Sequence, residues 1–435
     1  MRIQLFATTA AVLASFAVPT IHAAATPAPQ AAPEVTLTGF ARLPADTFTE
    51  GPPSGQFESD GRKLAAPRFA SQPVQGVSSI KPGPEPGTWW ALSDNGFGNQ
   101  ANSPDWRLCL YLFAVAPRTA DDDRNADRAL GPTSSSAVSG VKSDSQIGRV
   151  ELRRRIALSD PAGHFPFRLT HEFTPGRPLT GGDVDPESFV AMPDGTFWIS
   201  DEFGPWLLHV DGEGRLLAPP VAVPDFGPGR DPAKDFVRSP QNPAVLAGVR
   251  PANLGASRGF EGLAASPDFR TLYALLEGTV EGDPAGTLRI HEVDAATARF
   301  TGRFWRYRLE PAATAIGELA TVDATHFVVI ERDSKQGEAA AFKRLYEIEL
   351  AAADAAGVVP KRLVADLLAI ADPDHLAGFG PQFRFPYFTI ESVQVLDAQN
   401  LVVVNDNNFP ATGGRGPTVK DATEWLWLHL AAPLR

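Results

Sequence analysis

The chain has 435 residues, with 39 Lys and Arg against 51 Asp and Glu, so its formal net charge at pH 7 is −12. An acidic protein without a basic stripe is a poor partner for nucleic acid. Cys109 is the single cysteine, which excludes an intramolecular disulfide and favours a buried, inert thiol at that position. Glycine and proline are spread along the whole length without a long helical pattern, which favours one large, turn-rich β domain.

The first 25 residues have the composition of a secretory signal peptide. Arg2 precedes an apolar run from Leu5 to Val18, and three alanines follow at residues 23–25, as is typical before a cleavage site. The run is too short to span a membrane, and no later segment has the necessary length. Loss of Arg2 would change the net charge to about −13. We therefore expect a cleaved signal peptide (1–25), a disordered lead-in (26–33) and one domain (34–435) in a secreted or periplasmic protein without membrane insertion.

Short apolar segments separated by turns follow in chain order. We expect strands at Glu34–Leu43, Gly76–Ile80, Thr88–Asp94, Leu108–Val115 and Arg149–Leu158. The first of these is a candidate to complete a blade formed by the other end of the chain, which closes the ring in many β-propellers. Residues 219–257 are rich in proline and carry few strand patterns, so we expect a long loop there.

The clearest structural unit runs from Gly181 to Leu217. Four strand segments, Ser188–Met192, Thr196–Ser200, Trp206–Val210 and Arg215–Leu217, alternate with turns rich in Asp and Gly. This alternation is typical of one blade of a β-propeller. Five acids lie where the first strand starts and the second ends: Asp183, Asp185, Glu187, Asp201 and Glu202. Because these two ends meet at one edge of an antiparallel hairpin, we expect the carboxylates to converge.

The same pattern recurs along the chain. A polar residue at the first strand is followed 13 to 16 positions later by an acid that closes the second strand, in the pairs Ser79/Asp94, Glu187/Asp201, Glu261/Glu277, Glu318/Glu331 and Glu391/Asp406. Five irregularly spaced units predict a propeller of five to seven blades. We expect six, with the sixth in Gly148–Phe173 or in the loop after Leu217.

The repeat predicts an acidic funnel, because the inner strands of a propeller start at one face beside the central channel. Single acids of this kind often only cap turns, but the whole set favours a metal or substrate site. Hard cations such as Ca²⁺ prefer six to eight oxygen ligands. The candidate metal ligands are Glu187, Asp201, Glu202, Glu261, Glu331, Asp333, Glu391 and Asp406, with Asn95 and Asn407 as neutral oxygen donors or substrate contacts.

Zinc-dependent and P-loop chemistry find no support in the sequence. Zinc is disfavoured because the histidines are dispersed and no HExxH or Cys/His pairing occurs. The chain also has no P-loop. Metal-assisted attack by water remains, with Glu187, Asp201, Glu261 and Glu331 as candidate catalytic residues.

A few cationic side chains accompany the acids. Arg258 and Arg332 could each grip a phosphate through paired hydrogen bonds. The alternative for each is a structural ion pair with a neighbouring acid. For Arg384, which precedes the Glu391 strand, the ion pair is the favoured interpretation.

The run GGDVDPES…GTFWISDEFGP…LLHVDGEGRLL, followed by RGFEGLA, VIERDS and NDNNF, resembles the phytase-like family known as "esterase-like activity of phytase". The similarity extends in the same order from about Val35 to the C-terminus. It implies a secreted β-propeller that hydrolyses phosphoesters or related esters, with Ca²⁺ as in the propeller phytases. It supports as motif positions, without assigning each a role, Glu187, Asp201, Glu202, Glu261, Glu331, Arg332, Asp333, Asp406 and Asn407.

Three functions stay open at this point. The first is a metal-dependent hydrolase of small phosphoesters or related esters, since the acidic charge disfavours a substrate as anionic as phytate unless calcium is loaded first. The second is a propeller lactonase with one Ca²⁺ held by Glu, Asn and Asp. The third is a non-catalytic propeller that binds calcium or another ligand.

Overall fold

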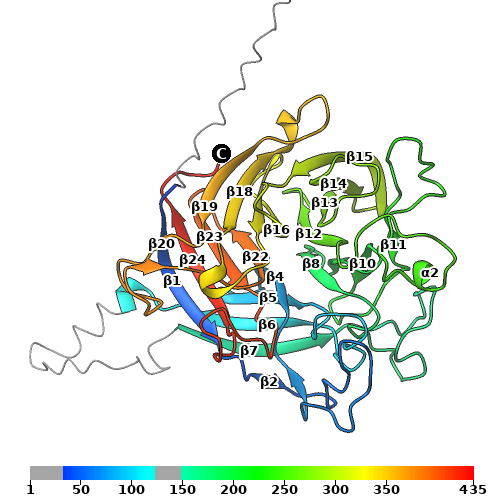
Figure 1. Ribbon diagram of the computed structural model, residues 1–435, viewed down its shortest axis with the longest axis horizontal. Helices are drawn as coiled ribbons and strands as arrows, with labels where there is room; N and C mark the ends of the chain where they lie inside the picture. The colour runs from blue at the N-terminus through cyan, green and yellow to red at the C-terminus, as the bar shows by residue number, and fades with distance from the viewer. Residues whose placement is uncertain (1–32, 123–147) are drawn as a thin grey trace, which may run out of the picture. The chain divides into compact units, whose positions relative to one another are not determined.

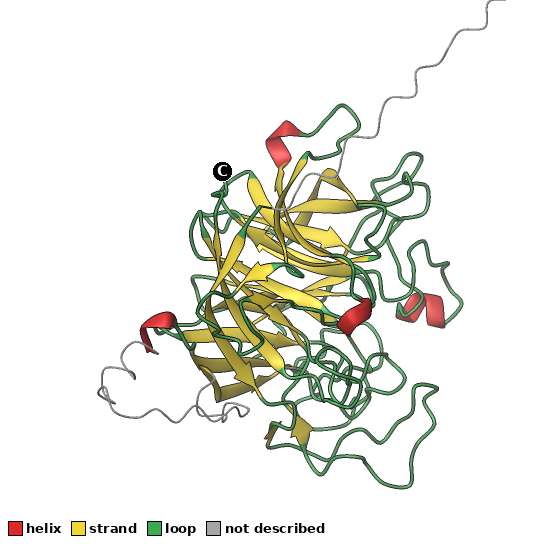
Figure 2. Ribbon diagram, turned by 60° about the vertical axis from the view of Figure 1, so that its left-hand side comes forward, coloured by secondary structure: helices red, strands yellow, loops and turns green. Residues whose placement is uncertain are grey.

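The computed structural model describes residues 33–122 and 148–435. The predicted signal peptide lies outside the described residues, as does all of the predicted lead-in except its last residue. The described residues form an all-β unit in which the helices are short (Figure 2). Within these ranges no helix is long and apolar enough to cross a membrane.

Five four-stranded antiparallel units contain most of the strands. In pairing order they are β4 (Val77–Pro82), β5 (Thr88–Ser93), β6 (Cys109–Ala116) and β7 (Gly148–Ala157); β8 (Pro186–Ala191), β9 (Phe197–Asp201), β10 (Trp206–Val210) and β11 (Val221–Ala222); β12 (Phe260–Ala265), β13 (Thr271–Leu276), β14 (Thr287–Asp294) and β15 (Arg299–Arg308); β16 (Ala315–Thr321), β17 (His326–Arg332), β18 (Lys343–Glu349) and β19 (Lys361–Asp366); and β22 (Ile390–Val395), β23 (Asn400–Asn405), β24 (Thr423–Leu430) and β1 (Val35–Leu43). This is the strand order of propeller blades.

The first strand of each unit lines the centre of a ring. Inner strands contact one another in the order β4, β8, β12, β16 and β22, and β22 contacts β4 in turn (Figure 1). The predicted β-propeller is therefore confirmed. The expected count of six blades is not: the described part of the chain contains five such units, and the two stretches considered for a sixth supply β7 and β11 instead.

The two ends of the described chain close the ring. β1 pairs antiparallel with β24 along its whole length, from Val35 opposite Leu430 to Leu43 opposite Thr423. It also pairs in parallel with β7, at Ala41 opposite Gly148. The prediction that the N-terminal strand completes a blade from the opposite end of the chain is confirmed.

The remaining elements lie in the connections. They are β2 (Phe48–Thr49), β3 (Gln72–Pro73), α2 (Pro243–Leu246), η2 (Gly337–Ala339), η3 (Leu350–Ala352), β20 (Ile370–Ala371) and β21 (Gln382–Phe383). The expected loop at 219–257 contains just β11 and α2.

The strand predicted at Arg215–Leu217 is wrong. The Asp211 carboxylate accepts hydrogen bonds from the backbone N–H groups of Glu213 and Arg215, which curls the chain into a turn. Leu216 then makes one isolated bridge with Val210. The fourth strand of that unit is β11.

The blades pack face to face, which explains why their second strands are continuous apolar runs. Every residue of β9 is buried, as is every residue of β13 after Thr271. Hydrophobic clusters fill the spaces between neighbouring blades; one joins Phe189 and Ile199 to Leu110 and Ile156. Because neighbours cover both faces of a blade, alternation of polar and apolar residues is lost there.

His291 of β14 is a buried polar side chain in this core. It lies fully buried among Phe260, Phe300 and Phe304, and within the described residues neither ring nitrogen has a hydrogen-bond partner. Burial lowers the pKa of His291 to about 3. An unpaired buried polar group costs about 1–3 kcal/mol.

We expect His291→Leu to raise the free energy of unfolding by about 1–2 kcal/mol at neutral pH. The pKa of His291 in the folded protein lies below the unfolded value of about 6.5, so the unfolded state binds a proton at this residue at higher pH than the folded state does. Proton binding to His291 therefore destabilises the wild type progressively as pH falls from 6.5 towards 3. Urea denaturation of the wild type and the variant at pH 7 and pH 5 measures both effects. A variant that is less stable at both pH values would contradict this account.

Candidate metal centre

The same irregularity occurs at the start of every inner strand. The pairing of each inner strand with its neighbour shifts by one residue, which is a β-bulge. The bulged positions are Ser78, Glu187, Glu261, Gly317–Glu318 and Glu391. Bulges re-aim side chains next to functional sites. Here the bulges turn Glu187, Glu261 and Glu391 towards the mouth of the central channel.

The second strands supply the rest of the cluster. In each blade, the residue just before the bulge pairs with a residue near the end of the second strand. The next residue along that second strand belongs to the cluster. These residues are Asp94, Glu202, Glu277, Arg332 and Asp406. Arg332 confirms that these positions converge, because its guanidinium lies 3.0 Å from Glu391, 3.6 Å from Glu261 and 3.9 Å from Glu277. The carboxylates gathered here are referred to below as the acidic ring. They are Asp94, Asp185, Glu187, Glu202, Glu261, Glu277, Glu391 and Asp406.

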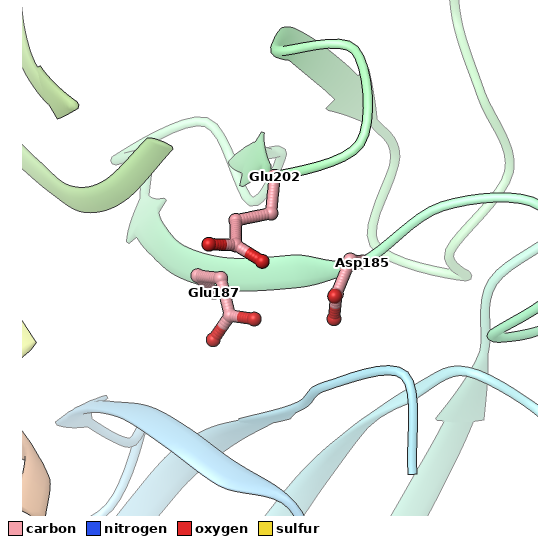
Figure 3. A group of neighbouring side chains, drawn as sticks. All are labelled: Asp185, Glu187 and Glu202. Carbon is pink, nitrogen blue, oxygen red and sulfur yellow. The ribbon is translucent and has the colours of Figure 1, made fainter. Parts of the chain in front are cut away.

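Two groups within the acidic ring have the spacing of metal ligands. Asp185, Glu187 and Glu202 form one, and Glu202, Glu261 and Glu277 form the other; in each, one carboxylate oxygen from every residue lies within 4.8 Å of the others. Figure 3 shows Glu202 reaching towards Glu187, which lies in β8, and Asp185, which directly precedes that strand. All five residues are buried. Glu202 belongs to both groups.

The electrostatics of the ring favour a bound cation. Burial, and then the neighbouring carboxylates, raise the pKa of Glu187 and Glu261 well above the usual range, and Glu202 behaves in the same way. Burial raises the pKa of both Glu391 and Asp406 to about 8, although Arg332 works in the opposite direction. So many buried acids cannot all ionise unless protons or cations neutralise them.

The two predicted arginines occupy different positions. Arg332 is buried, and its Nε atom has no hydrogen-bond partner among residues 33–122 and 148–435. The Arg258 side chain is 36% exposed and contacts Glu277 at 2.8 Å. It also donates a hydrogen bond to the Thr314 carbonyl. The structure shows the ion-pair alternative for both residues, since each pairs with an acid of the ring. Phosphate binding by either arginine stays a prediction.

Of the two asparagines, Asn95 contacts the ring directly, and Asn407 follows Asp406 in the chain. Asn95 donates to Asp185 through its backbone N–H at 3.0 Å and its side-chain amide at 2.7 Å, which orients that carboxylate. Asn407 is 1% exposed, and in the described part of the chain neither the oxygen nor the nitrogen of its side-chain amide has a hydrogen-bond partner. A buried amide is normally hydrogen-bonded, so Asn407 has an oxygen available for a ligand.

The structure does not bring three predicted ligands to the ring. Asp201 accepts backbone hydrogen bonds from Asp185 at 2.8 Å and Gly204 at 2.6 Å, and burial raises its pKa to about 7. Glu331 accepts from Tyr307 and pairs with Lys361 within the blade.

The reason is the alternation of side chains along a strand. Asp201 and Glu331 pair directly with Pro186 and Ile316, so they face away from the side on which Glu202 and Arg332 lie. Asp333 lies one position beyond Arg332, where it caps a loop by accepting from Ala341 and pairs with Lys343 at 3.1 Å. Catalysis by Asp201 or Glu331 therefore has no geometric support from the ring.

Glu318 is also displaced from its predicted level. It follows Gly317 in the bulge and bonds to Ser79 and Ser188, the residues after the bulged positions of their own strands. The sequence repeat aligns Glu318 with Glu187, but the strand pairing aligns Gly317 with Glu187, so the repeat is one residue out of register at this blade.

Sequence reasoning left Asp94, Asp185 and Glu277 out of the ligand set. Each had a signal: Asp94 and Glu277 were members of the repeat pairs, and Asp185 was one of the acids before the β8 strand. What was missing was the one-residue offset that the bulges impose.

Known proteins resemble this chain over much of its length. It is 25% identical over 311 residues to a protein of Arthroderma benhamiae named "Uncharacterized secreted protein", in a match that covers 59% of this chain and 56% of that protein. The chain thus spans little more than half of that curated relative.

Two solved structures also resemble the fold. Regucalcin from Agrobacterium tumefaciens, described as a calcium-binding protein, is 13% identical, with a TM-score of 0.35 over 83% of this chain and 92% of its own. The periplasmic gluconolactonase of Pseudomonas aeruginosa is 17% identical, with a TM-score of 0.31 over 92% and 98%. TM-scores this low carry no argument about function.

The family follows from the sequence match. A model of the phytase-like family, described as "Esterase-like activity of phytase", matches residues 72–409. That range begins just before β4 and ends after Asn407, so it contains every inner strand and all members of the acidic ring. The chain belongs to the phytase-like family.

Proposed function

We propose that this protein is a divalent-cation-dependent hydrolase of small phosphoesters or related esters, with its active site at the acidic ring. The observation that carries the proposal is Glu202, which is shared by two groups of three buried carboxylates. Arg332 and Arg258 lie beside them. Anionic ligands for a cation and cationic anchors for an anion therefore meet at one channel mouth.

The donor set fits a hard cation such as Ca²⁺, which prefers carboxylate, carbonyl and water oxygens. Asp185, Glu187 and Glu202 would hold one ion, and Glu202, Glu261 and Glu277 would hold a second. Asn407, which follows Asp406 in the chain, has an amide without a hydrogen-bond partner within the described residues and would offer a neutral oxygen. When bound, such an ion polarises the ester oxygen and lowers the pKa of water at the site.

The chain's own residues would perform the remaining work. Arg332 and Arg258 would orient the anionic part of the substrate, since a guanidinium matches phosphate geometry. Glu391 and Asp406 lie outside both three-acid groups, and burial raises the pKa of each to about 8. A group that titrates near the operating pH is an effective proton acceptor.

The proposal places the protein outside the cytoplasm, with a small molecule as its partner. The predicted signal peptide supports this, together with the name of the Arthroderma relative as a secreted protein.

Hydrolysis of 4-nitrophenyl phosphate and its bis-ester by EDTA-stripped protein tests the proposal. We expect activity to return with Ca²⁺ in the wild type and not in Glu261→Gln, while exposed Glu213→Gln behaves as the wild type. Cation binding without turnover on either ester would contradict phosphoester hydrolysis. Turnover of lactones instead would favour the lactonase interpretation, and no turnover on either class would favour a binding protein.

Arg332→Met separates substrate binding from cation binding. Loss of the guanidinium should raise KM for the phosphoester by about tenfold or more, the factor that corresponds to about 1.4 kcal/mol. It should not weaken Ca²⁺ binding, because it frees Glu391 from its ion pair. Steady-state kinetics and calorimetric titration with Ca²⁺ measure the two effects. Unchanged KM combined with weaker Ca²⁺ binding would make Arg332 a purely structural residue.

A further inference from the structure

The central channel has a second mouth, at the opposite ends of the inner strands. A cavity of about 430 Å³ opens there. Every inner strand contributes to its lining: Lys81 from β4, Val190 from β8, Leu263 from β12, Ala320 from β16 and Gln394 from β22. The volume lies within the range of small-molecule sites, which is about 300–1,000 Å³.

A polar layer separates this cavity from the acidic ring. Glu318 is fully buried and accepts hydrogen bonds from the hydroxyls of Ser79 and Ser188. Its carboxylate also pairs with Lys81 at 2.9 Å. Because Ser79 and Ser188 directly follow the bulged positions of β4 and β8, the layer lies just beyond the ring along the inner strands.

Lys81 presents the one cationic group that borders the cavity. Its side chain is 14% exposed, and its ammonium lies 2.9 Å from Glu318 and 3.1 Å from the Ser79 hydroxyl. An ammonium has three donors. Within the described residues the Lys81 ammonium makes no third hydrogen bond, although it lies 5.4 Å from the centre of the Phe189 ring. One N–H is therefore available to a hydrogen-bond acceptor in the cavity.

The charge balance decides what that molecule is. Glu318 already neutralises Lys81, and the other walls of the cavity are mostly apolar. Burying a further anion there would cost desolvation free energy without a counter-charge to compensate. A neutral oxygen that accepts one hydrogen bond carries no such cost.

We propose that this cavity binds a small, neutral, mainly apolar molecule with a carbonyl oxygen that accepts a hydrogen bond from Lys81. The site is separate from the acidic ring, and the inference does not depend on the proposed hydrolysis. Ligand-observed NMR titration of the full-length mature protein tests it, with 4-phenylbutan-2-one as the neutral probe and 4-phenylbutanoate as its charged match.

The ketone should bind saturably, and at least tenfold more tightly than the carboxylate. Gln394→Trp fills the cavity mouth and should abolish binding, whereas Gln399→Trp, which lies on the same blade and does not line the cavity, should leave it unchanged. The double variant Lys81→Met/Glu318→Gln removes both charges together, so that no buried carboxylate is left unpaired. It should weaken ketone binding about tenfold while circular dichroism stays native.

Three results would overturn the inference. They are an absence of saturable ketone binding by the wild type, binding that survives Gln394→Trp, and tighter binding of the carboxylate than of the ketone.

Discussion

Replacing Glu202 with glutamine is expected to abolish both cation binding and cation-dependent hydrolysis. Glu202 is the carboxylate that both three-acid groups share, so its loss removes a ligand from each at once. Disturbing residues that only support a metal ligand costs about 10–100-fold in affinity or activity, so the loss of a shared ligand should exceed about 100-fold. Calorimetric titration with Ca²⁺ and turnover of 4-nitrophenyl phosphate measure the two effects.

Glu331→Gln is the informative control for this prediction. Glu331 is a buried glutamate of the next-but-one blade, but it faces Tyr307 and Lys361 instead of the ring. We expect this variant to lose stability and keep its affinity for Ca²⁺. Equal losses of Ca²⁺ affinity in the two variants would contradict the division between ring and non-ring acids.

The stability of the cation-free protein is expected to fall as pH rises from about 4 to 8. Folding raises the pKa of Asp406 from 3.8 to about 8 and that of Glu391 from 4.5 to about 8. A group with a raised folded pKa binds its proton more tightly in the folded state. Its contribution is therefore fully present below the unfolded pKa and is lost as pH rises through the folded pKa.

The expected effect is large, because one pKa unit corresponds to about 1.4 kcal/mol. In EDTA, Tm should drop by roughly 5 °C or more between pH 5 and pH 8. Ca²⁺ should restore stability increasingly towards pH 8, because it replaces protons that the ring has lost.

The difference between the Ca²⁺ and EDTA melting curves at each pH isolates this effect, since groups remote from the ring, such as His291, contribute equally to both curves. A Ca²⁺ effect that is constant across this pH range would contradict the account.

Much of the fold was predictable because blade strands are regular. The positions of β1, β4 to β10, and the pairing of the N-terminal strand with the C-terminal blade, followed from apolar runs bounded by turn residues. The number of blades was not predictable, because β7 and the short β11 are the fourth strands of two blades and not parts of a sixth. Long connections separate both strands from the rest of their blades in the sequence.

The candidate site was predicted at the level of the rim but not of every residue. Glu187, Glu261 and Glu391 were identified because each lies at the same point of a repeated unit. Asp201 and Glu331 lie off the ring, because neighbouring residues of a strand point to opposite faces. Glu277, which the sequence indicates only as a member of a repeat pair, lies on the ring. A β-bulge inserts one extra residue into a strand and so shifts by one position which side chains face the ring. No residue pattern in a single sequence marks where such a bulge occurs.

The most direct measurement is a crystal structure of the protein soaked with Mn²⁺, whose anomalous signal marks the ion positions. The account predicts two peaks on either side of the Glu202 carboxylate, one beside Asp185 and Glu187 and the other beside Glu261 and Glu277. Peaks beside Asp201, Glu331 or Asp333, or no peak within the acidic ring, would contradict it.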